Sequence, residues 1–418
     1  MKKVLEMPPP VDWKSGLKKG ATLANAMLAL RSAQQWRGVL GFDEFRGDVM
    51  AMVRPVWGDR GLEREQAPFA FGDHHYVKVA EWLQQNEILA SSHLAREAVD
   101  AVARENSFHP VRDYLNGLKW DGESRLQTWL LDYMGARPEV FEDDTEAEKA
   151  GALAYIEAVG EKWLIGAVAR ILDPACKNDC CPIFEGLQGT FKSSALRALF
   201  DPWFSDDLSV IGSKDSQMQL KGVWCLEISE LDSMARADAE RVKAFLSRQM
   251  DRYRPSYGHA VIEQRRQVVF AGTSNGEHYL RDESGARRFW PVPTGKIRLG
   301  ALKRDSHQLK AEAVSRYRAG VTWWMDTPEL LAAGERYADG RYDEDPWHGL
   351  VVRQIEATAG LTGSVSVDQV LNEIVKKPQS QWVQSDKNRV ARILKKLKWV
   401  RKNTGGRGAR EWRYVKPC

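Results

Sequence analysis

The residues best suited to chemistry lie between Phe184 and Ser194, where two glycines, a lysine and a serine have the spacing of a phosphate-binding loop. An apolar strand is expected before this loop and a helix after it, so that backbone N–H groups at the helix N terminus face an anion. In such loops the lysine reaches the β- and γ-phosphates, and the serine hydroxyl binds Mg²⁺. The residues expected to bind ATP are Gly186, Gln188, Gly189, Thr190, Phe191, Lys192, Ser193 and Ser194.

One residue of this loop departs from the usual pattern G-x-x-x-x-G-K-[ST], because Phe191 stands at the second glycine. A side chain in the left-handed backbone conformation that glycine favours costs about 1–2 kcal/mol. Gly189 could supply the turn instead. Since the penalty is small beside the free energy of nucleotide binding, we expect ATP to bind with altered geometry. Weakened hydrolysis is the alternative.

Two later apolar segments end in polar side chains of the kind that an ATPase needs. Residues 223–230 predict a strand that ends in Glu227 and Glu230, of which one acid would hold the metal and the other would polarise the attacking water. The spacing does not assign these roles, so both acids, with the loop serine, are candidate Mg²⁺ ligands. Residues 267–275 predict a third buried strand, whose final Asn275 could orient the attacking water.

A pair of arginines, Arg287 and Arg288, precedes another apolar segment. An arginine supplied by a neighbouring subunit is a standard means of stabilising charge during phosphoryl transfer. Each of these features is common by itself, because an arginine pair is usually a solvated surface and a strand that ends in glutamate is usually only a strand. Their order within about one α/β domain length predicts an NTP-binding P-loop domain.

These residues resemble the virulence-associated E family of phage and mobile-element proteins, whose ATPase domain is similar to superfamily 3 helicases of the AAA+ class. The resemblance covers roughly residues 20 to 295 and rests on several spaced motifs. They include HPVRDYL at 109–115, LKWDG at 118–122, DPACK at 173–177, EGLQG at 185–189, VKAFLSR at 242–248 and RRFWPV at 287–292.

The resemblance implies an ATP-driven motor that moves along DNA as a ring, taken to be a homo-hexamer. It implies that Lys192 and Ser193 form Walker A and that Glu230, with Glu227, forms Walker B. Asn275 would then be the sensor residue. Arg288, with Arg287 beside it, would act on the ATP of a neighbouring subunit.

In superfamily 3 a hairpin before the sensor strand projects into the ring and grips one DNA strand. The matching stretch here is residues 251–266, in which Gly258 suits a turn. An ordinary surface hairpin is the alternative. The basic residues expected to contact single-stranded DNA are Arg252, Arg254, His259, Arg265 and Arg266.

The C-terminal region is strongly basic. Residues 350–418 contain 15 Lys and Arg against 5 Asp and Glu, a net charge of +10 in a chain whose total is +4. Apolar spacing predicts two helices, and a glycine-rich hairpin follows, which together look like a winged-helix module that would bind duplex DNA. A basic tail that aids solubility or binds a partner protein is the alternative. The expected DNA contacts are Arg389, Arg392, Lys396, Arg407 and Arg410.

Composition narrows the remaining possibilities. The 418 residues are 43% hydrophobic and predict two or three globular domains. No apolar run approaches the roughly 18 residues of a membrane span, and the N terminus lacks a signal-peptide core, so a cytoplasmic protein is expected. Cys176, Cys180 and Cys181 lack a nearby fourth ligand and are expected to be free thiols, largely buried. Most of the 16 tryptophans are expected in the core.

The predicted fold class is α/β, with a P-loop AAA+ core of superfamily 3 type. Residues 1–150 are expected to form a mainly helical collar for oligomerisation, residues 151–340 the ATPase domain, and residues 346–418 the winged helix. The leading functional hypothesis is an ATP-dependent DNA helicase that acts in phage or mobile-element replication. Phage or host replication proteins are its expected partners, and no membrane association is expected. The alternative is a DNA-binding initiator or regulator that ATP switches without unwinding.

Overall fold

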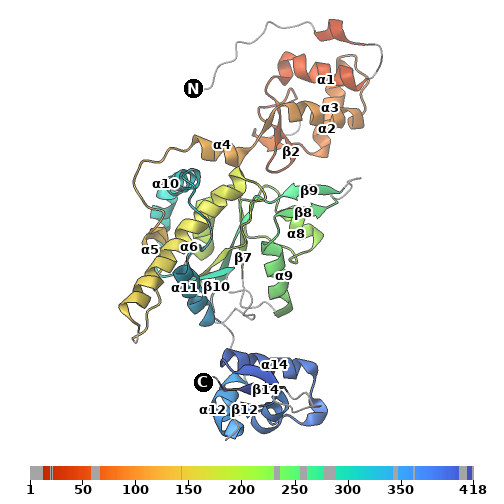
Figure 1. Cartoon of the computed structure of the whole chain (residues 1–418). Helices are drawn as coiled ribbons and strands as arrows, with labels where there is room; N and C mark the ends of the chain where they lie inside the picture. The colour runs from red at the N-terminus through yellow and green to blue at the C-terminus, as the bar shows by residue number, and fades with distance from the viewer. Residues whose placement is uncertain are drawn as a thin grey trace. The chain divides into compact units, whose positions relative to one another are not determined.

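The computed structural model describes residues 13–18, 20, 22–57, 66–142, 144–229, 236–254, 261–276, 288–341, 347–360, 363–403 and 412–416. The chain divides into two compact units, Met1–Arg341 and Tyr342–Cys418 (Figure 1). This division lies beside the predicted start of the C-terminal domain.

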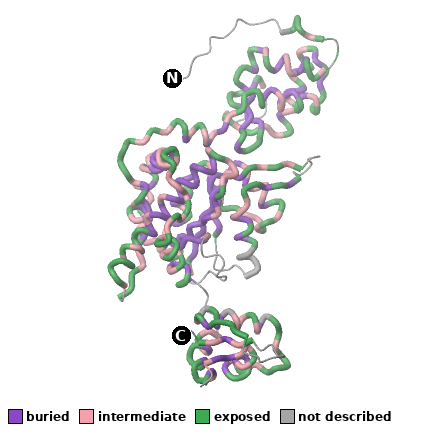
Figure 2. Tube along the Cα trace, viewed as in Figure 1, coloured by how far each residue is buried: buried purple, intermediate pink, exposed green. Residues whose placement is uncertain are grey.

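The first unit is built on a five-stranded sheet with the order β11-β5-β10-β7-β6. All neighbouring strands in it are parallel. Its three inner strands are buried along their whole length, as expected for a parallel sheet that is covered on both faces (Figure 2). The strands are β5 (Cys181–Glu185), β6 (Phe204–Ser205), β7 (Cys225–Ile228), β10 (Val269–Ser274) and β11 (Phe289–Pro293).

Helices connect and cover these strands. The long helix α6 packs against α10, and α10 packs against α7, which follows β5 directly. Trp163 of α6 is fully buried in this core and donates a hydrogen bond from its indole Nε1 to the Phe270 carbonyl of β10 at 3.0 Å. The helices are α6 (Glu146–Leu172), α7 (Lys192–Phe200), α8 (Lys214–Gln219), α9 (Arg236–Leu246), α10 (Leu299–Arg318) and α11 (Pro328–Asp339).

The start of α6 corrects the predicted domain boundary at residue 150. Thr145 caps the helix, because its hydroxyl accepts from the Glu148 N–H at 3.2 Å while the Glu148 carboxylate accepts from the Thr145 N–H at 2.8 Å. Residue 150 therefore lies inside one continuous helix that belongs to the core. Glu146 and Glu148 lie in the first turn of this helix.

The described N-terminal part of the first unit is mainly helical and also contains short strands. It contains a four-stranded sheet, β3-β2-β1-β4, besides its helices. These strands are only two to four residues long, which is too short for an alternating pattern to reveal them. The elements are η1 (Trp13–Gly16), α1 (Leu23–Ser32), η2 (Gln34–Trp36), β1 (Leu40–Asp43), β2 (Asp48–Ala51), β3 (Phe69–Ala70), α2 (Asp73–Gln85), α3 (Ser92–Glu105) and β4 (Ser107–Phe108).

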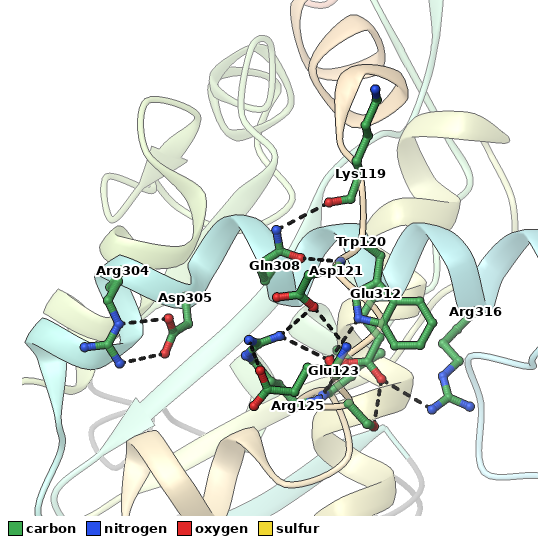
Figure 3. A network of polar contacts seen from close by, with 12 residues as sticks. Lys119, Trp120, Asp121, Glu123, Arg125, Arg304, Asp305, Gln308, Glu312 and Arg316 are labelled. Carbon is green, nitrogen blue, oxygen red and sulfur yellow. Dashed lines mark hydrogen bonds and ion pairs between the residues drawn. The ribbon is translucent and has the colours of Figure 1, made fainter.

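The segment between α4 (Pro110–Gly117) and α5 (Trp129–Met134) is held on α10 by a polar network (Figure 3). Glu312 of α10 is fully buried, and its carboxylate accepts hydrogen bonds from the backbone N–H groups of Arg125 and Leu126 at 2.7 and 2.8 Å. Gln308, one turn earlier, accepts from the Asp121 N–H at 3.0 Å. The LKWDG motif thus lies in a segment whose path α10 determines.

The second unit contains the helices and hairpin that the basic tail predicts. Its strands form a three-stranded antiparallel sheet, β12-β14-β13. The apolar residues predicted for the two helices, including Val370, Leu371, Ile393 and Leu394, are buried in one core. The elements are α12 (His348–Ala359), β12 (Ser364–Val365), α13 (Val367–Gln369), η6 (Val370–Ile374), η7 (Gln379–Gln381), α14 (Gln384–Lys396), β13 (Val400–Asn403) and β14 (Trp412–Val415).

Several smaller predictions can be compared with the structure. Trp129, Trp163 and Trp224 are fully buried, whereas Trp120, predicted with them to lie in the core, is half-buried. Cys180 and Cys181 are buried free thiols, whereas Cys176 is half-buried, and burial raises its pKa to about 11. Within the described ranges, none of the helices combines the length and the apolar character that crossing a membrane requires.

Candidate functional site

The loop that follows β5 turns sharply before α7. Gly186 has φ +151° and Gly189 has φ +81°, which are conformations that side chains rarely adopt. A Cβ atom on Gly186 would lie 2.9 Å from the Thr294 hydroxyl, so the loop passes close to the end of β11. The strand, loop and helix predicted around Lys192 are therefore present, with α7 beginning at Lys192 itself.

Phe191 also has a left-handed backbone, with φ +68° and ψ +24°. The suggestion that Gly189 could take over this turn is wrong, because both residues have positive φ. A non-glycine side chain in this conformation costs about 1–2 kcal/mol. The Phe191 side chain is 60% exposed at the edge of the loop.

Lys192 is buried beneath the loop. Its Nζ donates hydrogen bonds to the carbonyl oxygens of Gly186 and Leu187 at 2.6 and 2.9 Å. It also donates to Oδ1 of Asn275 at 3.1 Å, immediately after β10. The lysine and the asparagine predicted from separate parts of the chain are thus in direct contact.

Glu227 of β7 joins the loop to β10. Its Oε1 accepts hydrogen bonds from the hydroxyls of Ser193 and Thr273, both at 2.7 Å. Its Oε2 is buried, and among the described residues no hydrogen-bond partner reaches it. A buried carboxylate beside a serine hydroxyl, with one oxygen unpaired, fits a hard cation such as Mg²⁺, which prefers oxygen ligands.

These side chains line one pocket with a volume of about 350 Å³. Every residue predicted to bind ATP lines this pocket except Gly186, whose carbonyl oxygen accepts a hydrogen bond from Lys192 Nζ. Ser229 and Thr273 line it as well, although neither was assigned a role from the sequence. The polar Thr-Ser-Asn sequence at the end of the third predicted strand is the pattern that could have identified Thr273 as a site residue. Its contact with Glu227 depends on the pairing of β10 with β7.

Of the three remaining predicted catalytic residues, the structure describes Arg288. Glu230 and Arg287 are outside the described residues. Arg288 lies just before β11, whose Phe289 pairs with Cys181 at the beginning of β5. Arg288 is therefore at the opposite edge of the sheet from the loop. There its Nε donates to the Ser247 hydroxyl at 3.0 Å and lies 3.3 Å from Oδ2 of Asp179.

A buried ion-pair network supports the base of the loop, and no local pattern in the sequence indicates it. Arg341 donates from Nε and Nη2 to the two carboxylate oxygens of Glu185, at 2.8 and 2.7 Å. It also bonds both oxygens of Glu139. Because Glu185 is the last residue of β5, this fork fixes the strand end from which the loop departs.

The predicted hairpin is present as β8 (Met250–Tyr253) paired with β9 (Ile262–Arg265). Arg252, Arg254 and Arg265 are exposed on it. The prediction for Arg266 is corrected, because this residue is 2% exposed and its guanidinium forms a two-pronged pair with Asp251 at 2.6 and 2.8 Å. Its role is to fix the base of the hairpin. His259 lies outside the described residues.

In the second unit the predicted DNA contacts are only partly described. The Arg389 guanidinium lies over the Trp347 ring, with 4.0 Å between its central carbon and the ring centroid. Arg389 is half-buried there and helps to pack α14. Arg407 and Arg410 lie outside the described residues, as do the side chains of Arg392 and Lys396.

The fold and the pocket define a mixed α/β protein whose parallel sheet carries a loop-and-helix pocket at its carboxyl edge. Residues 115–340, more than half of the chain, match the virulence-associated protein E-like domain, and the chain belongs to this family.

Solved structures also resemble the chain, among them two of the NrS-1 C terminal region. The apo structure of the NrS-1 C terminal region has a TM-score of 0.46 and 14% sequence identity, and the similarity covers 96% of this chain and 99% of that one. The A form apo structure of the same region has a TM-score of 0.43 and 13% identity, with 90% of this chain and 96% of that one covered. No curated protein matches the chain in sequence.

Proposed function

We propose that this protein is an ATP-dependent DNA helicase or translocase of superfamily 3 type, acting in phage or mobile-element replication. The observation that carries the proposal is the convergence of Lys192, Asn275 and the Ser193–Glu227 pair around one pocket. A lysine and a hydroxyl at the start of α7, beside a carboxylate on β7, are the groups that nucleotide hydrolysis needs. The strand order, with the loop strand β5 between β11 and β10, supports an AAA+ core.

In this proposal ATP lies on the α7 N terminus, and its phosphates replace the loop carbonyls as partners of the Lys192 ammonium. Ser193 and Glu227 would hold Mg²⁺, which neutralises charge on the phosphates when bound. Asn275 would orient the attacking water, and Glu230 would accept its proton. Arg288 of an adjacent subunit would approach the γ-phosphate, so the active site would form only in an oligomer, proposed to be a hexamer.

Two basic regions would contact DNA. Arg252, Arg254 and Arg265 leave one face of the β8–β9 hairpin positive, which suits the backbone of a single strand. The second unit, with two helices and an antiparallel hairpin, is proposed to be a winged helix that binds duplex DNA. Its net charge of +10 over residues 350–418 supports this role.

Substitution of Lys192 tests the proposal directly. Lys192→Ala should reduce ATP turnover by at least about 100-fold, because the only ammonium group proposed to bind the phosphates is removed. The matched control is Lys149→Ala, which removes an exposed lysine paired with Glu146 on α6. ATP hydrolysis by both full-length variants should be measured with saturating Mg²⁺. Turnover at the wild-type rate in Lys192→Ala would refute the assignment.

The second candidate is an ATP-switched initiator or regulator that binds DNA without unwinding it. The left-handed Phe191, which distorts the position next to the phosphate-binding lysine, favours this reading. A strand-displacement assay with ATP and Mg²⁺ distinguishes the two functions. A helicase displaces the labelled strand, whereas a switch binds the same substrate and displaces nothing.

A further inference from the structure

A second pocket lies away from the loop and is lined mainly by aromatic and apolar side chains. It has a volume of about 470 Å³ and is formed by residues 177–180, by Trp290 of β11 and by the connection between α10 and α11. Trp323 and Trp324 of that connection form one wall, with their rings edge to face and 5.2 Å between the centroids. Trp324 is 50% exposed, so the aromatic wall is open to a partner.

This tryptophan pocket adjoins Arg288. Asp179 lines the pocket and also pairs with the Arg288 guanidinium at 3.3 Å, while Trp290 lies two residues after Arg288 on β11. The pocket is therefore at the amino edge of the parallel sheet. The loop that carries Phe191 is at the carboxyl edge, about 13 Å away along β5 at roughly 3.3 Å per residue. A side chain of the loop cannot reach the pocket of its own chain.

Phe191 lines the nucleotide pocket, but among the described residues its ring is not buried by a partner side chain. Its left-handed backbone favours glycine, and its side chain is 60% exposed rather than packed in the core. An exposed aromatic ring in an unfavourable backbone conformation is explained more simply by a contact with another molecule.

We infer that Phe191 of one copy of this chain inserts into the tryptophan pocket of a second copy. The inference rests on the proposed function, in which Arg288 reaches the triphosphate beside Lys192 of its neighbour. If it does, the residue that precedes Lys192 must come close to the pocket that adjoins Arg288. The protruding ring and the pocket lie on different faces of the same chain, which is the arrangement of a head-to-tail interface that can close into a ring.

The chemistry of the two surfaces matches. A phenyl ring meets indole rings favourably in edge-to-face arrangements, and its burial removes apolar surface from water on both sides. The loop residues before Phe191, Gly189 and Thr190, are uncharged, and the ammonium group of Lys192 after it is buried and bonded to the Gly186 carbonyl. The neighbouring Leu187 is also exposed, at 79%, and is the competing occupant within the same loop.

Self-association of full-length variants tests this contact. Sedimentation velocity in Mg²⁺ and a saturating non-hydrolysable ATP analogue should compare wild type, Phe191→Ala, Trp324→Ala and the double variant. Each single substitution should weaken association about tenfold or more. The double variant should be no weaker than either single one, because both changes remove the same contact. Leu89→Ala, at a side chain that is 76% exposed elsewhere, is the control and should associate like wild type.

The alternatives give different results. Effects that multiply in the double variant, or a Phe191→Ala variant that associates normally, would overturn the contact. If Trp324→Ala and Leu187→Ala together weaken association no more than either alone, the pocket binds Leu187 rather than Phe191. That result would also overturn the proposed contact. Thermal unfolding of each variant separates a loss of contact from a loss of fold.

The outcome can be separated from that of the proposed function. If mixed Lys192→Ala and Arg288→Ala chains regain ATP hydrolysis while Phe191 and Trp324 act independently, the shared active site stands and the pocket contact fails. If wild type does not self-associate with the nucleotide analogue and the mixture stays inactive, both fail.

Discussion

At the scale of single residues, Glu227 links three elements of the pocket. Its carboxylate on β7 accepts hydrogen bonds from Ser193 on α7 and from Thr273 on β10, and its second oxygen is buried with no hydrogen-bond partner among the described residues. The Thr273 hydroxyl therefore orients a group that is proposed to hold Mg²⁺. Such outer partners commonly change metal affinity by about 10–100-fold when they are removed.

Substitution of Thr273 tests this arrangement. Thr273→Val keeps the shape of the side chain but removes the hydroxyl, so the Mg²⁺ concentration required for half-maximal ATP hydrolysis should rise about tenfold or more. Thr273→Ser retains the hydroxyl and should behave like wild type. A Mg²⁺ titration of hydrolysis with each variant provides the measurement. An unchanged requirement in Thr273→Val would show that this bond does not position the metal ligand.

Lys310 provides a second test, of stability. It is 5% exposed, and its Nζ donates to the Leu199 carbonyl in the last turn of α7 at 2.7 Å. Burial lowers the pKa of Lys310 from 10.5 to about 8. Between pH 8 and pH 10.5 the folded protein therefore binds fewer protons than the unfolded chain. The free-energy cost of burying the charged ammonium group is present in full below pH 8 and decreases as the pH rises.

The free energy of unfolding of wild type should therefore rise between about pH 8 and 10.5, by up to about 3 kcal/mol relative to Lys310→Met. Denaturant unfolding of both proteins across this pH range measures the difference. Parallel curves for the two proteins would mean that Lys310 keeps its ordinary pKa in the folded state.

At the scale of elements, the β8–β9 hairpin separates its arginines into two functions. Arg252, Arg254 and Arg265 are exposed, with Arg252 3.6 Å from Glu263, whereas Arg266 is buried against Asp251. The alternation follows from the period of two in a strand, which turns successive side chains to opposite faces. Charge at the exposed face affects binding, and charge at the base affects stability.

The two kinds of arginine should respond differently to alanine. Replacing Arg252, Arg254 and Arg265 together should weaken single-stranded DNA binding and reduce the slope of log affinity against log salt by about 2, at roughly 0.7 per phosphate contact. Arg266→Ala should instead lower the free energy of unfolding by about 3–5 kcal/mol, because it leaves Asp251 buried without its partner. Fluorescence anisotropy at several salt concentrations and denaturant unfolding measure the two effects. An unchanged salt slope in the triple variant would exclude the hairpin as a DNA contact.

At the scale of the whole molecule, most of the residues that line the pocket could be predicted from the sequence, whereas the ion pairs and short strands around it could not. Lys192, Ser193, Glu227 and Asn275 could be selected because each follows or ends an apolar segment, and the carboxyl ends of parallel strands meet at one edge. Arg341 and Glu185 are 156 residues apart, and nothing local marks such a pair. The N-terminal strands are too short to show an alternating pattern. The burial of Arg266 depends on its tertiary contact with Asp251, which cannot be predicted from the presence of basic residues in a hairpin.

The central claim is that one active site is formed by two chains, and mixing inactive variants tests it most directly. Lys192→Ala and Arg288→Ala should each lack ATP hydrolysis when alone. Asp179→Asn removes the charge that Arg288 pairs with in its own chain, and this control variant should retain hydrolysis. In an equimolar mixture of the two inactive variants, random head-to-tail assembly gives about a quarter of the sites an intact Lys192 and an intact Arg288 from the neighbour. The account predicts recovery of about a quarter of wild-type hydrolysis. A mixture that stays as inactive as its two components would contradict it.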